Sequence, residues 1–166
     1  IEPERHTDTR GFFCERFQAD RFREHGLPTI FVQENWSRSL PRVLRGLHYQ
    51  RGQGKLVGVT RGRILDVAVD IRPRSVTFGC FVGRVMSGDD GAMLWIPAGY
   101  AHGFCVIDGP ADVVYQMDVL YDPAQEGGIV WNDQDLAIPW RMDYPIVSAR
   151  DASLPRFAEY RAAIAA

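Results

Sequence analysis

Long hydrophobic runs and blocks of like charge are missing from this 166-residue chain, and it contains a single lysine. No segment approaches the roughly 18 apolar residues of a membrane span, and the first ten residues, IEPERHTDTR, are too charged for a signal peptide. The formal net charge of −2 disfavours a nucleic-acid-binding protein but leaves room for a local basic pocket. We therefore expect a soluble protein that binds neither membranes nor nucleic acids.

Cysteine is also scarce. Cys14, Cys80 and Cys105 are odd in number, widely spaced and set among apolar neighbours, whereas a disulfide framework usually has an even set. They are interpreted as reduced core residues, which predicts a cytoplasmic location. The length and the 46% content of hydrophobic residues fit one folded domain over residues 1–166.

Short apolar runs separated by Gly, Pro or Asp predict an all-β sandwich or barrel. The stretch KLVGVTRGRILDVAVDIR (residues 55–72) predicts two strands around a turn at residues 61–63, with Leu65, Val67 and Val69 on one face. Further strands are expected in TFGCFVGRVMS, AMLWIPAGYAHGFCVI and ADVVYQMDVLY, with turns at SGDDG and DGP between them.

Two short helices are predicted beside these strands. One runs from Gln18 to His25 and is ended by Gly26, and the other begins near Leu154 with Ser153 as its cap. Because neither helix carries a motif, the chemistry is expected inside the β fold.

His48 lies in an apolar, strand-like run, VLRGLHYQ (residues 43–50). A single histidine in such a run is more often a hydrogen-bonded structural residue than a metal ligand or a catalyst. A second signal is PAGYAH (residues 97–102), which has the Pro-x-Gly-x-x-His form of the second motif of cupin barrels. The two histidines, His48 and His102, are therefore candidates for one site.

The residues after His48 argue against a metal. In metal-binding cupins the first motif resembles His-x-His followed by Glu, but here Gln50 takes the second His position and Lys55 stands near the Glu position. An ammonium repels the cation that such a shell would hold. Lys55 can instead act as the fixed positive charge that stabilises a developing oxyanion, although an arbitrary lysine is more often a solvated surface residue.

Nine blocks carry a family resemblance. In order they are RGFFCERF, FVQENWSRS, VLRGLHYQ, QGKLVGVTRGRILDVAVDIR, TFG, LWIPAGYAHGF, VVYQMDVLYDP, GGIVWNDQDLAIPW and SARD. Over roughly residues 10–151 the chain resembles the dTDP-4-dehydrorhamnose 3,5-epimerase family. The resemblance implies a double-stranded β-helix (a cupin-like jelly roll) with a few short helices, one of them C-terminal. It also implies a site without metal or cofactor, and a homodimer that exchanges N-terminal strands.

The same resemblance implies roles for four residues in epimerising a nucleotide-linked 4-keto-6-deoxy sugar. His48 matches the base, Asp151 the carboxylate that supports its imidazolium, Tyr115 the acid on the opposite face, and Lys55 the cation beside the ketone oxygen. Without the resemblance, Asp151 reads as a helix N-terminal charge and Tyr115 as a core aromatic residue.

Further positions match the substrate-binding residues of the family. Arg10 and Arg45 match phosphate contacts, Tyr121 a residue that lines the sugar pocket, and His102 a second-shell or substrate-lining histidine of the barrel. The full set is Arg10, Glu15, Gln33, Asn35, Arg45, Gln50, His102 and Tyr121.

Several departures bear on the substrate. The loop from His48 to Lys55 is shorter than in most of the family, and Trp36, Gln116 and Arg150 replace a common histidine and two lysines. The alternatives are an epimerase acting at carbon 3 only, one acting on CDP- or GDP-linked sugars, a noncatalytic sugar-binding cupin and a metal-dependent cupin oxygenase. Gln50 and Lys55 disfavour the last, and the combined presence of a base and an acid disfavours the binding protein.

Overall fold

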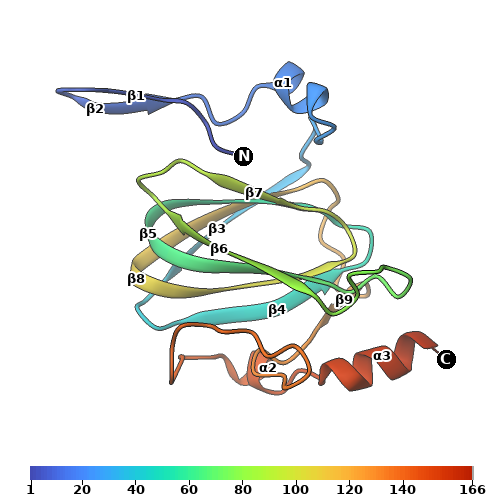
Figure 1. Cartoon of the computed structure of the whole chain (residues 1–166). Helices are drawn as coiled ribbons and strands as arrows, with labels where there is room; N and C mark the ends of the chain where they lie inside the picture. Colours follow the sequence, from blue (N-terminus) through green and yellow to red (C-terminus); the bar gives the residue numbers. More distant parts are fainter. Residues whose placement is uncertain (166) are drawn as a thin grey trace.

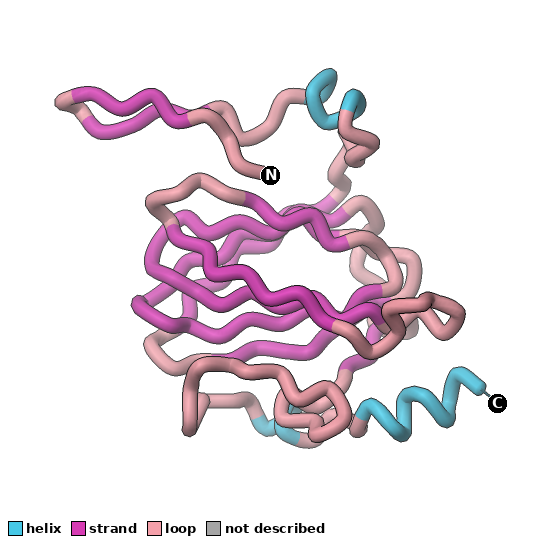
Figure 2. Tube along the Cα trace, in the orientation of Figure 1, coloured by secondary structure: helices cyan, strands magenta, loops and turns pink. Residues whose placement is uncertain are grey.

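The computed structural model describes residues 1–165 and forms a curled antiparallel sheet of seven strands, beside which a two-stranded hairpin projects (Figures 1 and 2). One half of the curled sheet has the order β6-β5-β8-β4-β9, and in the other half β3 pairs with β8 and β7 pairs with β5. The strands are β1 (Arg5–Asp8), β2 (Gly11–Cys14), β3 (Gln33–Ser39), β4 (Leu44–Gln50), β5 (Lys55–Asp70), β6 (Phe81–Ser87), β7 (Met93–Ile96), β8 (Tyr100–Met117) and β9 (Glu126–Gly128). This confirms the predicted jelly roll.

Strands β5 and β8 each run through both halves of the sheet, which corrects two predicted turns. The expected turn at residues 61–63 is a bend inside β5, where the register with β8 shifts, and the DGP segment lies inside β8. Gly62 has φ +74°, and a Cβ there would lie 2.5 Å from the Pro110 carbonyl oxygen. Because the two strands bend together, the extra residues form a bulge instead of reversing the chain. The SGDDG turn between β6 and β7 is present.

Helix α1 (Ala19–Glu24) confirms the first helix prediction. The Gln18 side chain accepts a hydrogen bond from the Arg21 amide, and Gly26 follows the helix with φ +68°.

The second helix prediction is wrong in its start and its cap. The last helix, α3, spans Phe157–Ala165, and a separate short helix, α2, spans Ala149–Ala152. Ser148 caps the start of α2 and Ser153 ends it. Pro155 disfavours helical geometry at the residue before it, which separates the two helices.

Side chains of β5 alternate between two apolar layers. Leu65, Val67 and Val69 face the C-terminal segment, where they pack in one cluster with Trp140 and Phe157. This confirms the predicted alternation. The other face of the strand contributes to a second cluster inside the curled sheet, so β5 is buried on both sides.

The cysteines are free, but only Cys105 is a core residue. Its thiol donates to the Trp140 carbonyl oxygen, and burial raises the pKa of Cys105 to about 11. Cys80 is exposed and Cys14 half-buried. The prediction that all three lie in the core is therefore wrong for these two, because their apolar neighbours lie at the ends of edge elements and not in the packed layers.

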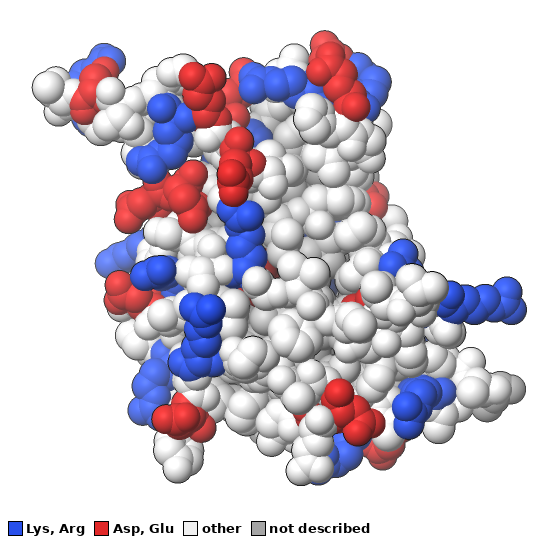
Figure 3. All heavy atoms as spheres, in the orientation of Figure 1, with Lys and Arg blue, Asp and Glu red and all other residues white. Residues whose placement is uncertain are grey.

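The molecular surface carries mixed charge. On the face shown in Figure 3, acidic and basic side chains are interspersed. No helix within residues 1–165 is long and apolar enough to cross a membrane.

Candidate active site

A cavity of about 560 Å³ lies between the curled sheet and the segment that contains α2. Its volume is within the usual range for small-molecule sites. It brings together residues that are far apart in sequence, from β3, β4, β5, β8, β9 and α2. The lining residues are Ser37, Val43, Leu44, Arg45, His48, Lys55, His102, Phe104, Tyr115, Glu126, Ile146, Val147, Ser148, Arg150 and Asp151.

Strand β4 presents His48 to this cavity because the strand passes unusually close to β8. Gly46 has φ +127°, and a Cβ at that position would lie 2.6 Å from the Gly103 Cα. Only glycine fits such an approach at this backbone angle. Two residues later His48 lies opposite His102 of β8 and Gly128 of β9.

His48 and Asp151 form a hydrogen-bonded pair at the cavity wall. The distance from His48 Nε2 to Asp151 Oδ1 is 2.8 Å, and the other carboxylate oxygen accepts from the Gly46 amide at 3.1 Å. Because an ionised carboxylate only accepts, Nε2 carries the proton and the Nδ1 lone pair is left for another group. The His48 side chain is 29% exposed and that of Asp151 6%, so a ligand can reach the imidazole but not the carboxylate.

The electrostatic setting keeps His48 neutral and Asp151 ionised. Burial lowers the pKa of His48; the Asp151 hydrogen bond and charge oppose this, and the Lys55 and Arg150 charges add to it. Burial acts to raise the pKa of Asp151, but the Gly46 amide and His48 outweigh it, and the pKa is lowered. A neutral imidazole beside a carboxylate is a competent general base.

Lys55 begins β5 and lines the cavity as a half-buried cation. Burial lowers the pKa of its ammonium, and the charges of Glu126 and Asp66 oppose that effect. Within residues 1–165 Lys55 forms no ion pair. The surface-lysine interpretation is therefore wrong, and the charge is directed to the cavity, where it can stabilise an oxyanion.

Tyr115 lies on β8, half-buried, across from Asn35 of β3 and Val57 of β5. It lines the main cavity and a smaller adjoining cavity of about 120 Å³. Both cavities are also lined by His48, Lys55 and Glu126. An aromatic hydroxyl, a basic imidazole and a cation therefore share one space.

The smaller cavity holds four of the predicted substrate-binding residues: Gln33, Asn35, Gln50 and Tyr121. Gln33 and Asn35 are on the half-buried face of β3, and the Gln33 amide donates to Asn35 Oδ1. The Gln50 side chain donates to the Leu120 carbonyl oxygen and accepts from the Asp122 amide. Gln50 thereby fixes the loop that carries Tyr121 and has little amide capacity left for a ligand.

His102 is buried and forms its own pair with a carboxylate. Its Nε2 lies 2.5 Å from Asp66 Oδ1, and Asp66 is fully buried in β5. Among the described residues, Asp66 Oδ2 has no hydrogen-bond partner. His102 thus lines the cavity with a largely buried side chain, held by a residue that sequence reasoning did not select.

Two charged residues of the cavity were also missed as site residues. Glu126 of β9 accepts from the Tyr121 hydroxyl and pairs with Arg150 of α2, with 2.7 Å for each contact. Arg150 was noted only as a replacement for lysine, and no motif pointed to Glu126.

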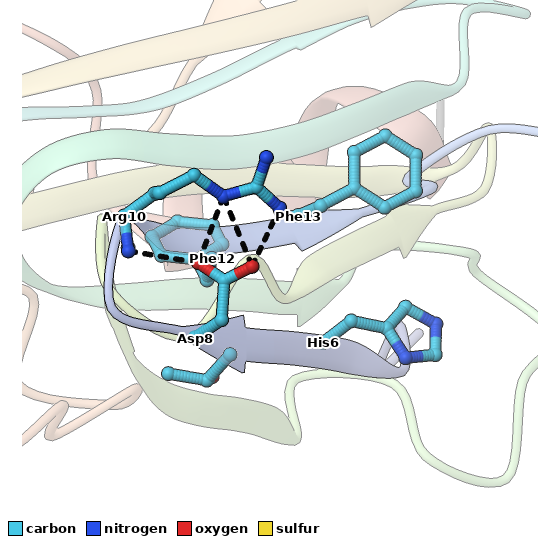
Figure 4. Close-up of a pocket in the computed structure, with 7 residues that line it drawn as sticks. His6, Asp8, Arg10, Phe12 and Phe13 are labelled. Carbon is cyan, nitrogen blue, oxygen red and sulfur yellow. Dashed lines mark hydrogen bonds and ion pairs between the residues drawn. The ribbon is translucent and has the colours of Figure 1, made fainter.

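Arg10 and Glu15 lie outside the cavity of their own chain. Figure 4 shows Arg10 on the β1–β2 hairpin with its guanidinium joined to Asp8 at 2.6 Å, and Glu15 pairs with Arg21 of α1. The hairpin bears a concavity of about 560 Å³, but its charged groups satisfy each other. A single chain therefore does not assemble Arg10 and Glu15 with Arg45, which lines the main cavity.

The donor set of the cavity is poor for a metal ion. Within residues 1–165 no group of three or more His, Cys, Asp and Glu side chains is placed to hold one. The charge of Lys55 works against a cation at this place for the same reason as in the sequence argument.

Known proteins resemble the chain over most of its length. The sequence model of the dTDP-4-dehydrorhamnose 3,5-epimerase family matches residues 1–159. An Escherichia coli K12 protein of that name is 51% identical over 145 residues, which are 84% of this chain and 78% of that protein. A Streptomyces niveus protein named dTDP-4-dehydrorhamnose 3-epimerase is 38% identical over 165 residues, 97% of this chain and 80% of that protein.

A solved structure is similar in fold as well as sequence. It is the dTDP-6-deoxy-D-glucose-3,5-epimerase of Legionella pneumophila Philadelphia 1 in complex with dTDP-4-keto-L-rhamnose. The TM-score is 0.89 at 46% identity, over 96% of this chain and 89% of that chain.

Proposed function

Because the chain belongs to the dTDP-4-dehydrorhamnose 3,5-epimerase family, we propose that it is an isomerase that inverts carbons 3 and 5 of dTDP-4-keto-6-deoxyglucose. The reaction belongs to deoxysugar biosynthesis of the dTDP-L-rhamnose type. The observation that carries the proposal is the His48–Asp151 pair, which lines one cavity with Lys55 and Tyr115. These are a base, a cation and an acid, the three groups that epimerisation beside a ketone requires.

Proton removal is assigned to His48. Its Nδ1 takes the proton from the carbon next to the 4-keto group, and the C–H electron pair becomes the double bond of an enolate. Asp151 holds the ring through Nε2 and stabilises the imidazolium that forms, as carboxylates do in other histidine-based sites.

Stabilisation of the enolate is assigned to Lys55. The ketone oxygen becomes negative as the proton leaves, and an ammonium held in a half-buried position acts on that charge more strongly than it would in water. No metal or cofactor is required for this step.

Tyr115 is assigned the return of the proton. Its hydroxyl delivers a proton to the opposite face of the carbon, which leaves a phenolate and an inverted centre; exchange with solvent resets both Tyr115 and His48. Tyr121, Gln33 and Asn35 line the adjoining space and are assigned to the sugar and nucleotide. Arg45 is assigned to the diphosphate, because a guanidinium binds phosphate oxygens in a two-pronged fashion.

Arg10 and Glu15 are assigned to the site of a second chain. The β1–β2 hairpin stands away from the barrel (Figure 1), and it exposes Phe12 and Phe13 by 47% and 69%. An arm with exposed aromatic side chains fits a homodimer in which N-terminal strands are exchanged. Each cavity is then completed by the arm of the partner.

A cytoplasmic location is also proposed. The cysteines of the chain are free, which suits a reducing compartment. Fractionation of the native cells, with the protein detected by antibody, tests this location.

Epimerisation at carbon 3 alone is the second candidate. It is favoured by the Streptomyces niveus relative, whose name specifies a 3-epimerase. The short loop from His48 to Lys55 borders the same cavity and is a place where the two activities can differ. A CDP- or GDP-linked sugar and a noncatalytic binding role are outcomes of the same test.

The deciding experiment is proton NMR in deuterated water with freshly generated dTDP-4-keto-6-deoxyglucose. Loss of the signals at carbons 3 and 5 at catalytic rates supports the double epimerase, and loss at carbon 3 alone supports the second candidate. If folded protein causes no exchange, the proposed substrate is wrong, and CDP- and GDP-linked ketosugars are the next trial.

The base assignment has its own control in the same assay. We expect His48→Ala to abolish exchange at every ring carbon while circular dichroism shows an intact fold. The other histidine that lines the cavity, His102, is only 9% exposed and is bound to Asp66. Exchange retained in this variant would exclude His48 as the base.

A further inference from the structure

Glu126 connects three segments at the mouth of the catalytic cavity. It is the first residue of β9 and lies opposite Gln50 of β4. Its Oε2 atom is 2.7 Å from the Tyr121 hydroxyl, on the loop after β8, and 2.7 Å from Arg150, on α2. One carboxylate oxygen therefore ties a loop and a helix to the edge of the sheet.

The position of Glu126 distinguishes it from an ordinary surface ion pair. A pair as exposed as Arg150, at 60%, usually contributes little. The Glu126 side chain, however, is only 18% exposed, and it lines both the main and the adjoining cavity. A partly buried charge at this place acts on its neighbours through a lower dielectric than a surface charge does.

The cavity contains several cationic side chains, and two of the carboxylates around it are already paired with histidines. Lys55 and Asp66 come from β5, Arg45 and His48 from β4, His102 and Tyr115 from β8, and Arg150 and Asp151 from α2. Asp66 is already paired with His102, and Asp151 with His48. Glu126 is thus the carboxylate that lines both cavities together with Lys55 and is not paired with a histidine. Its partner Arg150 is the cation next to Asp151 in sequence.

We propose that Glu126 is a positioning residue, which ties Arg150 to Tyr121 at the edge of the cavity and places a carboxylate in the space that Lys55 lines. The inference rests on the proposed function for what Lys55 does, but the effect of Glu126 on Lys55 is a property of the protein alone. Burial lowers the pKa of Lys55, and Glu126 is the largest charge that opposes this. Without Glu126, a larger fraction of Lys55 becomes neutral and the enolate loses its counter-charge.

The composition of the chain makes a direct test practical. Lys55 is the only lysine in the 166 residues, so untagged protein grown with lysine that is ¹³C-labelled at the ε-carbon gives one methylene signal, whose shift reports the titration of Lys55. We expect Glu126→Gln to lower the apparent pKa of Lys55, because the largest charge that opposes the effect of burial is removed. In Glu126→Asp, which keeps the charge, the apparent pKa of Lys55 should be close to that in the unchanged protein.

The matched control is Glu34→Gln. Glu34 is an exposed carboxylate on the outward face of β3, where it accepts from Gln116, so this change removes the same charge without touching the cavity. The Lys55 titration should not move. An unmoved Lys55 titration in folded Glu126→Gln, or an equal shift in Glu34→Gln, would overturn the inference.

Kinetics supply the second readout. In Glu126→Gln the high-pH limb of kcat/KM for deuterium exchange should move to lower pH together with Lys55, and kcat should fall about tenfold because the reacting groups are misplaced. A rise in KM with an unmoved limb would mean that Glu126 only packs the mouth, and would overturn the inference. If Glu126→Gln does not fold, Glu126→Asp decides: its shorter side chain cannot span both partners, and unchanged kinetics would contradict the tie.

The proposed epimerase function and the positioning role of Glu126 can be contradicted independently. Absence of exchange in the unchanged protein would remove the proposed function, whereas the Lys55 titration would still confirm or contradict the part assigned to Glu126.

Discussion

The reactivity of His48 is set by its immediate surroundings. Burial favours the neutral ring, and the carboxylate of Asp151 offsets this effect only in part, so the pKa of His48 lies below its usual value of 6.5. The same carboxylate holds Nε2 at 2.8 Å and directs Nδ1 away from itself. A histidine in this state is ready to accept a proton near pH 7.

The lowered pKa of His48 should be visible in the pH dependence of the activity. The free enzyme is active only when His48 is neutral, so the low-pH limb of kcat/KM should have its midpoint below pH 6.5, and activity should be lost only as the pH falls through that lowered value. Arg150→Gln removes a cation that lowers the His48 pKa, so in this variant the limb should move to higher pH. A pH profile of deuterium exchange measures both, and a limb that stays in place would contradict the assignment.

Tyr115 separates two steps of the reaction. Tyr115→Phe keeps the ring that packs in β8 and removes only the hydroxyl, so His48 can still exchange protons on one face. We expect inversion to fall by about 10²-fold or more, the usual contribution of a positioned acid, while exchange falls much less. NMR of exchange and of product in one sample measures the ratio, and an equal loss of both would mean that the hydroxyl serves to bind the substrate.

At the level of elements, the close contact of β4 with β8 is what places the site. The backbone at Gly46 lies against Gly103, and the Gly46 amide also binds Asp151. The segment around Gly46 therefore fixes how closely β4 packs against β8. It also fixes the orientation of His48 and the position of α2 against β4.

Gly46→Ala should consequently be costly. Its Cβ would meet Gly103 at 2.6 Å from a backbone angle that favours glycine, and we expect a loss of about 3 kcal/mol or more in the free energy of unfolding. Gly52→Ala is the matched control, since Gly52 also has positive φ (+74°) but open space around it, which should limit the loss to about 1 kcal/mol. Urea unfolding compares them, and similar losses would show that backbone strain alone matters at Gly46.

At the level of the whole molecule, the exchanged arm can be tested by mixing two defective chains. If Arg10 acts in the cavity of the partner, a heterodimer of His48→Ala and Arg10→Ala has one intact cavity. Mixing and re-forming dimers should then restore about a quarter of the normal sites, as random pairing predicts. If the mixture is no more active than the two separate variants added together, Arg10 does not act in the cavity of the partner.

Two controls accompany the mixing experiment: a measurement of the oligomeric state and a second pair of variants. Analytical ultracentrifugation of the unchanged protein should show a dimer. Mixing His48→Ala with Tyr115→Phe should restore no activity, because both residues line the cavity of their own chain and every cavity in the mixed dimer therefore lacks one of them. Restored activity in that second mixture would contradict the assigned cavity.

How far the sequence predicts the molecule depends on the range of each interaction. The alternation of Leu65, Val67 and Val69 and the helix ended by Gly26 were predicted because they follow from neighbours within a few residues. The bend in β5 at Gly62 was taken for a turn, since only its pairing with β8 distinguishes the two.

By itself, the sequence determined the residue types of the site and the arguments that favour a metal-free base and cation at His48 and Lys55. Its family resemblance also indicated Asp151, which lies 103 positions from His48. The tertiary structure alone decided that Asp66 pairs with His102 and that Glu126 joins Tyr121 to Arg150. Such partners carry no local pattern, because they meet only after β4, β5, β8, β9 and α2 have packed around one cavity.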